Sequence, residues 1–260
     1  YKGKTIYKTQ YATDERGNRL HPGKLGQAKT LFFGGSFVYG EGVDSSKTLP
    51  AHFEFCPGYA PVANLGVPGY GPGHLLALAQ SGYFEQFSHA QTMFILFPDF
   101  HIRRANGTDA LLVRSPGLYP RFDERGVQLG DYSQVSLFKR LRAKFMSWII
   151  PGWDYPRYGE YHQNQIEHAV KLLAFTKALL PKGLHMEVVL LPEFKKQFDL
   201  ITLFLKKHEV SFHLPSFEVE NSMFYLADRH PTAEYYSALF RALTLSLETE
   251  CRLDAFRRAW

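Results

Sequence analysis

Short apolar runs that stop at glycine or proline alternate along this chain with stretches of helical periodicity. The runs are residues 29–33, 61–65, 92–97, 185–191 and 210–213. The helical stretches are residues 48–55, 74–86, 160–180, 194–208 and a last amphipathic segment after Pro231. An uninterrupted apolar run such as residues 92–97 is typical of a strand buried on both faces. The alternation therefore predicts an α/β fold, with a mainly parallel sheet covered by helices on both faces.

The domain organisation follows from length and from where the alternation is interrupted. A chain of 260 residues can form one large domain or two small ones. Without internal repeats or a linker, one domain is the simpler interpretation. We expect an extended N-terminal segment over residues 1–28, the domain over 29–250 and a C-terminal tail over 251–260. Residues 105–160 break the alternation and predict an insertion on one side of the sheet, containing a hairpin and an amphipathic helix.

Charge and cysteine content exclude several classes of protein. The net charge of +5 is mildly basic, and without a run of five basic residues we expect no nucleic-acid partner. Two distant cysteines, Cys56 and Cys251, form no metal-ligand pattern and leave open whether they pair. No apolar run approaches the ~20 residues that cross a bilayer. Because the chain begins at Tyr1, a removed signal peptide, a membrane anchor or a further domain upstream stays open.

Polar residues collect where the predicted strands end. Residues 34–36, Gly-Gly-Ser, follow the first run, and residues 66–73 contain four glycines and two prolines. Residues 98–103 form a polar loop after the third run, and an Asp-x-His sequence at 228–230 precedes the last helix. Open α/β sheets bind ligands at the carboxyl ends of their strands. A serine, a base, an orienting acid and a glycine-rich backbone together meet the requirements of acyl transfer.

Three of these segments resemble the conserved blocks of the SGNH/GDSL hydrolases. Residues 34–37, Gly-Gly-Ser-Phe, resemble the nucleophile block, residues 64–69, Asn-Leu-Gly-Val-Pro-Gly, the second block, and residues 228–231, Asp-Arg-His-Pro, the last. Their order and separation match the family, and the resemblance spans about residues 29–247. It implies a flavodoxin-like doubly wound sheet and serine-dependent ester chemistry.

The resemblance also implies roles for individual residues. Ser36 would be the nucleophile, His230 the base that takes its proton, and Asp228 the acid that orients the imidazole. The backbone N–H groups of Ser36 and Gly69 would donate to the oxyanion, and Asn64 of the second block would contribute to substrate binding. No cofactor and no metal are called for.

The chain departs from the family at two positions. Gly35 stands where the family has aspartate, and residues 97–101, Phe-Pro-Asp-Phe-His, stand where it has Gly-x-Asn-Asp. The amide that completes the oxyanion hole is therefore missing, and loss of one such donor typically costs a factor of ~10²–10³ in rate. His101, Asp99 and Arg103 are the candidates to replace it.

We expect an esterase that acts on a small-molecule or polysaccharide ester, with O-acyl groups of a carbohydrate favoured by analogy with the family. The alternatives are an O-acyltransferase, a non-catalytic binding module of the same fold, and a lipid esterase, for which no long apolar groove is visible. Aromatic residues of the insertion could stack on sugar rings or form a small satellite core; they are Tyr119, Trp148, Trp153 and Tyr155. Ser36 could also be only a turn residue. We favour an extracytoplasmic location over a cytoplasmic one.

Overall fold

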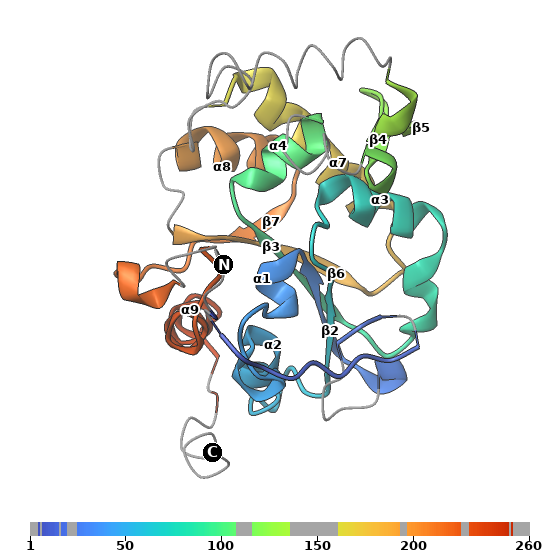
Figure 1. Cartoon of the computed structure of the whole chain (residues 1–260). Coiled ribbons are helices and arrows are strands. Elements are labelled where there is room, and N and C mark those ends of the chain that lie inside the picture. The colour runs from blue at the N-terminus through green and yellow to red at the C-terminus, as the bar shows by residue number, and fades with distance from the viewer. Residues whose placement is uncertain are drawn as a thin grey trace.

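The structure is a computed structural model of the 260-residue chain (Figure 1). It describes residues 5, 7–15, 17–19, 25–107, 116–135, 161–192, 197–224, 229–249 and 251. The amphipathic helix expected in the insertion, over residues 135–150, lies outside these ranges apart from its first residue, as do most of the expected C-terminal tail and residues 1–4. In the described part, no helix is both long and apolar enough to cross a membrane.

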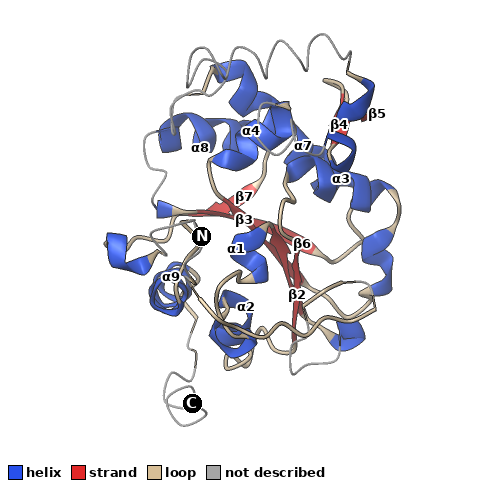
Figure 2. Ribbon diagram, in the orientation of Figure 1, coloured by secondary structure: helices blue, strands red, loops and turns tan. Residues whose placement is uncertain are grey.

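A five-stranded parallel sheet lies at the centre of the domain (Figures 1 and 2). Its strands are β1 (Thr30–Gly34), β2 (Val62–Gly66), β3 (Thr92–Phe97), β6 (His185–Leu190) and β7 (Ser211–His213). They are ordered β2-β1-β3-β6-β7. Counted along this sheet the order is 2-1-3-4-5, which is the flavodoxin-like doubly wound order. The predicted fold class is therefore confirmed.

Helices cover both faces of the sheet because successive strand residues point to opposite sides. Phe33 and Ile95 pack on one face against α3 (Pro72–Gln80), α4 (Phe100–Asn106), α7 (Gln163–Leu179) and α8 (Phe198–Lys207). Phe32 and Phe94 pack on the other against α1 (Ser36–Tyr39), α2 (Leu49–Phe53) and α9 (Ala233–Ser246). All five residues of β1 are buried, as the apolar run predicted.

Two local predictions differ from the structure at helix ends. The predicted helix over 74–86 ends earlier, because Gly82 takes the left-handed conformation with φ 72° and only a 3-10 turn follows it. Residues 98–103, predicted as a loop, instead begin α4 at Phe100. The carboxyl end of β3 therefore leads almost directly into a helix.

The insertion contains the expected hairpin. Strands β4 (Pro120–Phe122) and β5 (Gln128–Asp131) pair antiparallel in a separate two-stranded sheet. Tyr119 precedes β4 and is buried, with 4% of its surface exposed. Its ring packs edge-on against His74 of α3 with the centroids 5.1 Å apart, so Tyr119 is packed rather than presented to solvent. The three other aromatic residues considered for sugar stacking lie outside the described residues.

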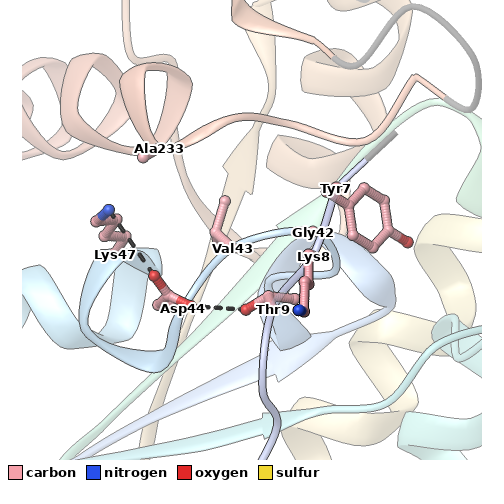
Figure 3. Close-up of a pocket in the computed structure, with 8 residues that line it drawn as sticks. All are labelled: Tyr7, Lys8, Thr9, Gly42, Val43, Asp44, Lys47 and Ala233. Carbon is pink, nitrogen blue, oxygen red and sulfur yellow. Dashed lines mark hydrogen bonds and ion pairs between the residues drawn. The ribbon is translucent and has the colours of Figure 1, made fainter. Parts of the chain in front are cut away.

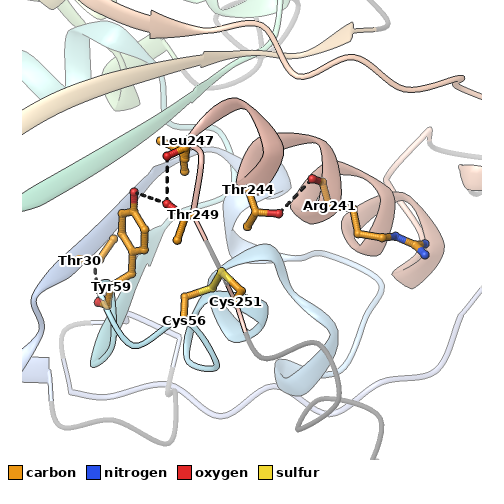
Figure 4. The surroundings of a disulfide bond; sticks show 8 residues. All are labelled: Thr30, Cys56, Tyr59, Arg241, Thr244, Leu247, Thr249 and Cys251. Atoms are coloured by element: carbon orange, nitrogen blue, oxygen red, sulfur yellow. Dashed lines mark hydrogen bonds between the residues drawn. A yellow bond between two sulfur atoms is a disulfide. The ribbon is translucent and has the colours of Figure 1, made fainter.

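A disulfide joins Cys56, after α2, to Cys251, after α9, across 195 residues of sequence (Figure 4). The Cα atoms are 4.4 Å apart, within the usual range for disulfides. Beside it, the Tyr59 hydroxyl lies 3.5 Å from Oγ1 of Thr249. The pair ties the end of the last helix to the edge of the sheet that carries β2.

Candidate active site

Ser36 is the first residue of a single helical turn at the carboxyl end of β1. It is buried, with 6% exposed, and its carbonyl accepts hydrogen bonds from the N–H groups of Gly40 (2.9 Å) and Glu41 (3.1 Å). Gly40 ends the turn in the left-handed conformation, with φ 79°. The sequence correctly placed the serine at the end of the first strand. The structure adds that this strand lies next to β3, where the direction of winding reverses and flavodoxin-like folds bind ligands.

The end of β2 holds this turn in place. Asn64 is 1% exposed and uses both ends of its amide: Nδ2 donates to the Val38 carbonyl (2.9 Å), and Oδ1 accepts from the Gly66 N–H (3.0 Å). A Cβ on Gly66 would lie 2.2 Å from the Tyr39 nitrogen, so only glycine allows the close approach. Asn64 thus positions the turn through hydrogen bonds to the backbone, and its contribution to substrate binding stays a prediction.

The glycine-rich loop after β2 runs beside the nucleophile turn. The Val67 N–H donates to the Gly34 carbonyl (3.0 Å), and the Tyr70 carbonyl lies 3.2 Å from the position of a Cβ on Gly35. Gly69 has φ +92°, a conformation that favours glycine. Within the described part of the chain, neither the Ser36 N–H nor the Gly69 N–H donates a hydrogen bond. Both N–H groups are therefore available to a ligand.

His101 lies on α4, the helix that follows β3, and its ring lies beside Gly35. It is 2% exposed, and its Nε2 lies 3.6 Å from the position of a Cβ on Gly35. Neither ring nitrogen has a hydrogen-bond partner among the described residues. Burial, then the positive charge of Arg104, holds the pKa of His101 well below its ordinary value, so the ring is neutral and carries one N–H. A neutral donor therefore stands beside the nucleophile turn.

Arg104 fills the space beside Gly35. Its Nη1 donates to the Tyr70 carbonyl (2.6 Å) and would lie 2.7 Å from a Cβ on Gly35. The guanidinium carbon also lies 4.5 Å from the centre of the Phe100 ring. The space that a side chain at position 35 would need is therefore filled by an arginine from α4. Arg104 was not identified from the sequence, although it follows directly on residues 97–103.

The remaining candidates of the third block are buried. Oδ2 of Asp99 accepts a hydrogen bond from the Tyr161 hydroxyl (3.1 Å), and Asp99 is 3% exposed. Arg103 is 8% exposed on α4. Tyr161 lies two residues before the start of α7. It was not identified from the sequence, because a single tyrosine at that position does not indicate a carboxylate partner. The Asp99 carboxylate is thus held by the residue that precedes the N-cap of α7.

His230 lies next to the nucleophile turn, on the face of the sheet opposite to the one that α4 covers. Its ring centroid is 6.2 Å from that of Phe37, the residue after Ser36. Its Nε2 lies 3.4 Å from Oε2 of Glu41. Glu41 was not predicted, because its relation to His230 exists only in the folded chain. Asp228, the expected orienting acid, lies outside the described residues.

A cavity of about 300 Å³ lies beside the loop that follows α1 (Figure 3). It lies between the N-terminal segment, the loop after α1 and the start of α9. Its lining residues are Tyr7, Lys8, Thr9, Gly42, Val43, Asp44, Lys47 and Ala233. The Asp44 carboxylate accepts from the Thr9 hydroxyl (2.7 Å) and pairs with Lys47 (3.8 Å). Among the described residues, no group of acidic, histidine or cysteine side chains could hold a metal ion.

No protein-family model matches the chain, and no curated protein matches it in sequence. Solved structures do align with most of it. A catalytic mutant of Axe2, an acetylxylan esterase from Geobacillus stearothermophilus, is 12% identical over 86% of this chain and 95% of that chain, with a TM-score of 0.46. LAE5, an alpha/beta hydrolase enzyme from the metagenome of Lake Arreo, Spain, is 12% identical over 85% and 95%, also with a TM-score of 0.46.

A third structure is a putative lipolytic protein of the G-D-S-L family from Desulfitobacterium hafniense. It is 12% identical over 84% of this chain and 99% of that chain, with a TM-score of 0.41. Structures similar to this chain thus include GDSL-type lipolytic hydrolases. The fold class itself follows from the strand order of the sheet.

Proposed function

We propose that the protein is a serine-dependent ester hydrolase, with Ser36 as nucleophile, His230 as base and Asp228 as the acid that orients it. The observation that carries the proposal is the convergence of separate segments on one turn. Gly35 is flanked by Tyr70 and His101, and Phe37 packs against His230. These segments bring together the residue types that acyl transfer requires.

The proposed reaction has two stages, acylation of Ser36 and removal of the acyl group. His230 takes the proton from Ser36 Oγ while Oγ attacks the acyl carbonyl, which forms a tetrahedral oxyanion. The N–H groups of Ser36 and Gly69 donate to that oxyanion, and the neutral His101 supplies the third donor in place of the family's amide. The proton on His230 passes to the leaving alcohol, and the acyl group remains on Ser36. Water, or a hydroxyl of an acceptor sugar, then takes the acyl group by the reverse sequence.

We propose an O-acyl group of a carbohydrate as the substrate. Support comes from the cavity between the N-terminal segment, the loop after α1 and the start of α9, which is lined mainly by hydroxyl-bearing and charged side chains. Such a lining suits a hydroxylated alcohol better than a long acyl chain. A lipid esterase would instead require an extended apolar groove, and activity that rises with acyl length.

The proposal is tested by reaction with a fluorophosphonate probe, followed by peptide mapping. Labelling is expected at Ser36 in the wild type, none in Ser36→Ala, and a loss of at least a hundredfold in rate in His230→Ala. Ser46→Ala, a nearby serine on the loop after α1, is the matched control and should label like the wild type. Absence of labelling in the folded wild-type protein would refute the proposal.

One observation favours a second candidate, a glycan-binding module without turnover. The third block lacks the amide of the family, and a buried histidine stands near the nucleophile turn instead. This candidate predicts that an acylated oligosaccharide binds without release of acid, and that Ser36→Ala binds it equally well. Release of acetate from that oligosaccharide would exclude it.

A further inference from the structure

The nucleophile turn is too short to be stable by itself. α1 has four residues, and a helix of this length depends on contacts with the rest of the protein. The last carbonyl groups of a helix have no partner within it, so their donors must come from elsewhere. The Val38 carbonyl accepts from Nδ2 of Asn64 (2.9 Å), and the carbonyls of Tyr39 and Gly40 come next in the chain. The position of Ser36 therefore depends on what holds the end of this turn.

Arg19, in the N-terminal segment, donates to the carbonyls that follow. Its Nη1 donates to the carbonyls of Tyr39 (2.6 Å) and Gly40 (2.6 Å), and its Nη2 donates to that of Val43 (2.5 Å). Its Nε donates to the Ser45 hydroxyl (3.2 Å). A guanidinium is planar and presents its donors in a rigid fork, so these acceptors are fixed relative to one another. Arg19 thus closes the carboxyl end of the nucleophile turn and holds the loop after it.

Arg19 is itself held firmly in place. It is 1% exposed, and its guanidinium carbon lies 4.7 Å from the centre of the Tyr11 ring and 5.2 Å from that of Tyr39. Its backbone forms antiparallel bridges with Thr13 and with Asn64. Asn64 is the β2 residue whose amide binds the same turn. The two side chains that bind the end of the turn therefore come from segments that are paired with each other.

Gly40 allows the guanidinium to come this close. Its φ of 79° lies in the left-handed region that favours glycine, and a Cβ there would lie 3.0 Å from Nη1 of Arg19. The hydrogen bonds from Arg19 to Gly40 and Val43 are buried. Loss of these donors would leave carbonyls in the interior with fewer partners, which is unfavourable unless the loop moves.

We propose that Arg19 is a positioning residue for Ser36, and that the N-terminal segment is thereby part of the catalytic unit. This inference rests on the proposed function of Ser36. The Ser36 carbonyl accepts from the N–H groups of Gly40 (2.9 Å) and Glu41 (3.1 Å). A shift of the loop at Gly40 is therefore passed to the nucleophile. Arg19 acts through the turn and takes no part in the transfer of a proton or of the acyl group.

The experiment compares Arg19→Met, Arg19→Lys and the control Leu173→Ala. Arg19→Met removes all four hydrogen bonds, whereas Arg19→Lys keeps the charge without the fork. Leu173 is 0% exposed on α7, on the opposite face of the sheet, so Leu173→Ala lowers stability away from the site. Urea unfolding establishes that each variant is folded under the assay conditions. Fluorophosphonate labelling of Ser36 at several probe concentrations separates the rate constant at saturation from the half-saturating concentration.

Arg19→Met should lower the rate constant at saturation by roughly a hundredfold, the order expected when a reacting group is misplaced by about 1 Å. Its half-saturating concentration should stay within about twofold of the wild type. Arg19→Lys should lie between the two, and it carries the comparison if Arg19→Met does not fold. Leu173→Ala should unfold at lower urea and label at the wild-type rate. The proposal is overturned if the arginine variants label like the wild type, or if Leu173→Ala loses as much rate.

Amide hydrogen exchange provides a measurement that needs no labelling. The N–H groups of Gly40 and Glu41, which donate to the Ser36 carbonyl, should exchange at least about tenfold faster in Arg19→Met than in Leu173→Ala. Equal exchange in the two variants would overturn the inference. If the wild-type protein is folded and is not labelled, the proposed function fails, and the exchange of these two amides still decides whether Arg19 holds the turn.

Discussion

Gly66 is the residue whose replacement should most directly separate the nucleophile turn from the sheet. A Cβ at this position would lie 2.2 Å from the Tyr39 nitrogen, 2.6 Å from the Val38 carbonyl carbon and 2.8 Å from the Tyr39 Cα. These are backbone atoms, and they cannot rotate away as the end of a flexible side chain would. Ordinary contact begins near 3.4 Å, so β2 and α1 must part by 3.4 − 2.2 = 1.2 Å.

The cost of Gly66→Ala follows from that displacement. Overpacking that shifts backbone costs about 1–3 kcal/mol. The hydrogen bond from Asn64 to Val38 crosses the same contact, and the one from Gly66 holds the same amide from within β2; each contributes about 1 kcal/mol. Replacing glycine also restricts the unfolded chain, which returns about 0.4–1 kcal/mol. We expect a net loss of about 2–4 kcal/mol in the free energy of unfolding, with a larger relative loss of Ser36 labelling.

Urea unfolding at pH 7 measures this loss, with Gly58→Ala as the control. A Cβ on Gly58 would meet nothing within 4 Å, so this variant should unfold within about 0.5 kcal/mol of the wild type. A Gly66→Ala protein that unfolds like Gly58→Ala and labels normally would refute the packing of α1 against β2. The comparison therefore tests the geometry on which the nucleophile's position depends.

Two further predictions concern the whole domain. Burial lowers the pKa of His52 and of His74 from 6.5 to about 4. Below pH 6.5 the unfolded chain therefore binds more protons than the folded one. The stability that both histidines contribute in full above pH 6.5 is lost as the pH falls towards 4. Each histidine should cost about 2 kcal/mol between pH 7 and pH 5, and a free energy of unfolding that stays flat over this range would contradict the burial. Reduction of the Cys56–Cys251 disulfide should lower the unfolding free energy by about 2–5 kcal/mol, and two thiols should react with iodoacetamide only after reductant is added. A native, unreduced protein with two reactive thiols would show that the pair does not form.

Much of the architecture could be predicted from local pattern, because strand and helix formation depend on residues close in sequence. The apolar run over 92–97 became β3, and the run over 29–33 became β1 within a residue. The hairpin signal at residues 123–126 became the turn between β4 and β5. Ser36 and the glycine-rich loop were found because both follow strands, and the carboxyl ends of parallel strands meet at one edge.

Tertiary structure alone decided which side chains meet around that edge. The hydrogen bonds of the Asn64 amide to α1 and to the end of β2 exist only in the folded chain. Whether the cysteines pair depends on where α9 ends relative to α2, 195 residues away in the chain. The contact of Glu41 with His230 likewise joins two segments that no local pattern relates. The sequence by itself determined the elements and the chemical groups at their ends, whereas distances between those groups were decided only when the sheet brought remote segments together.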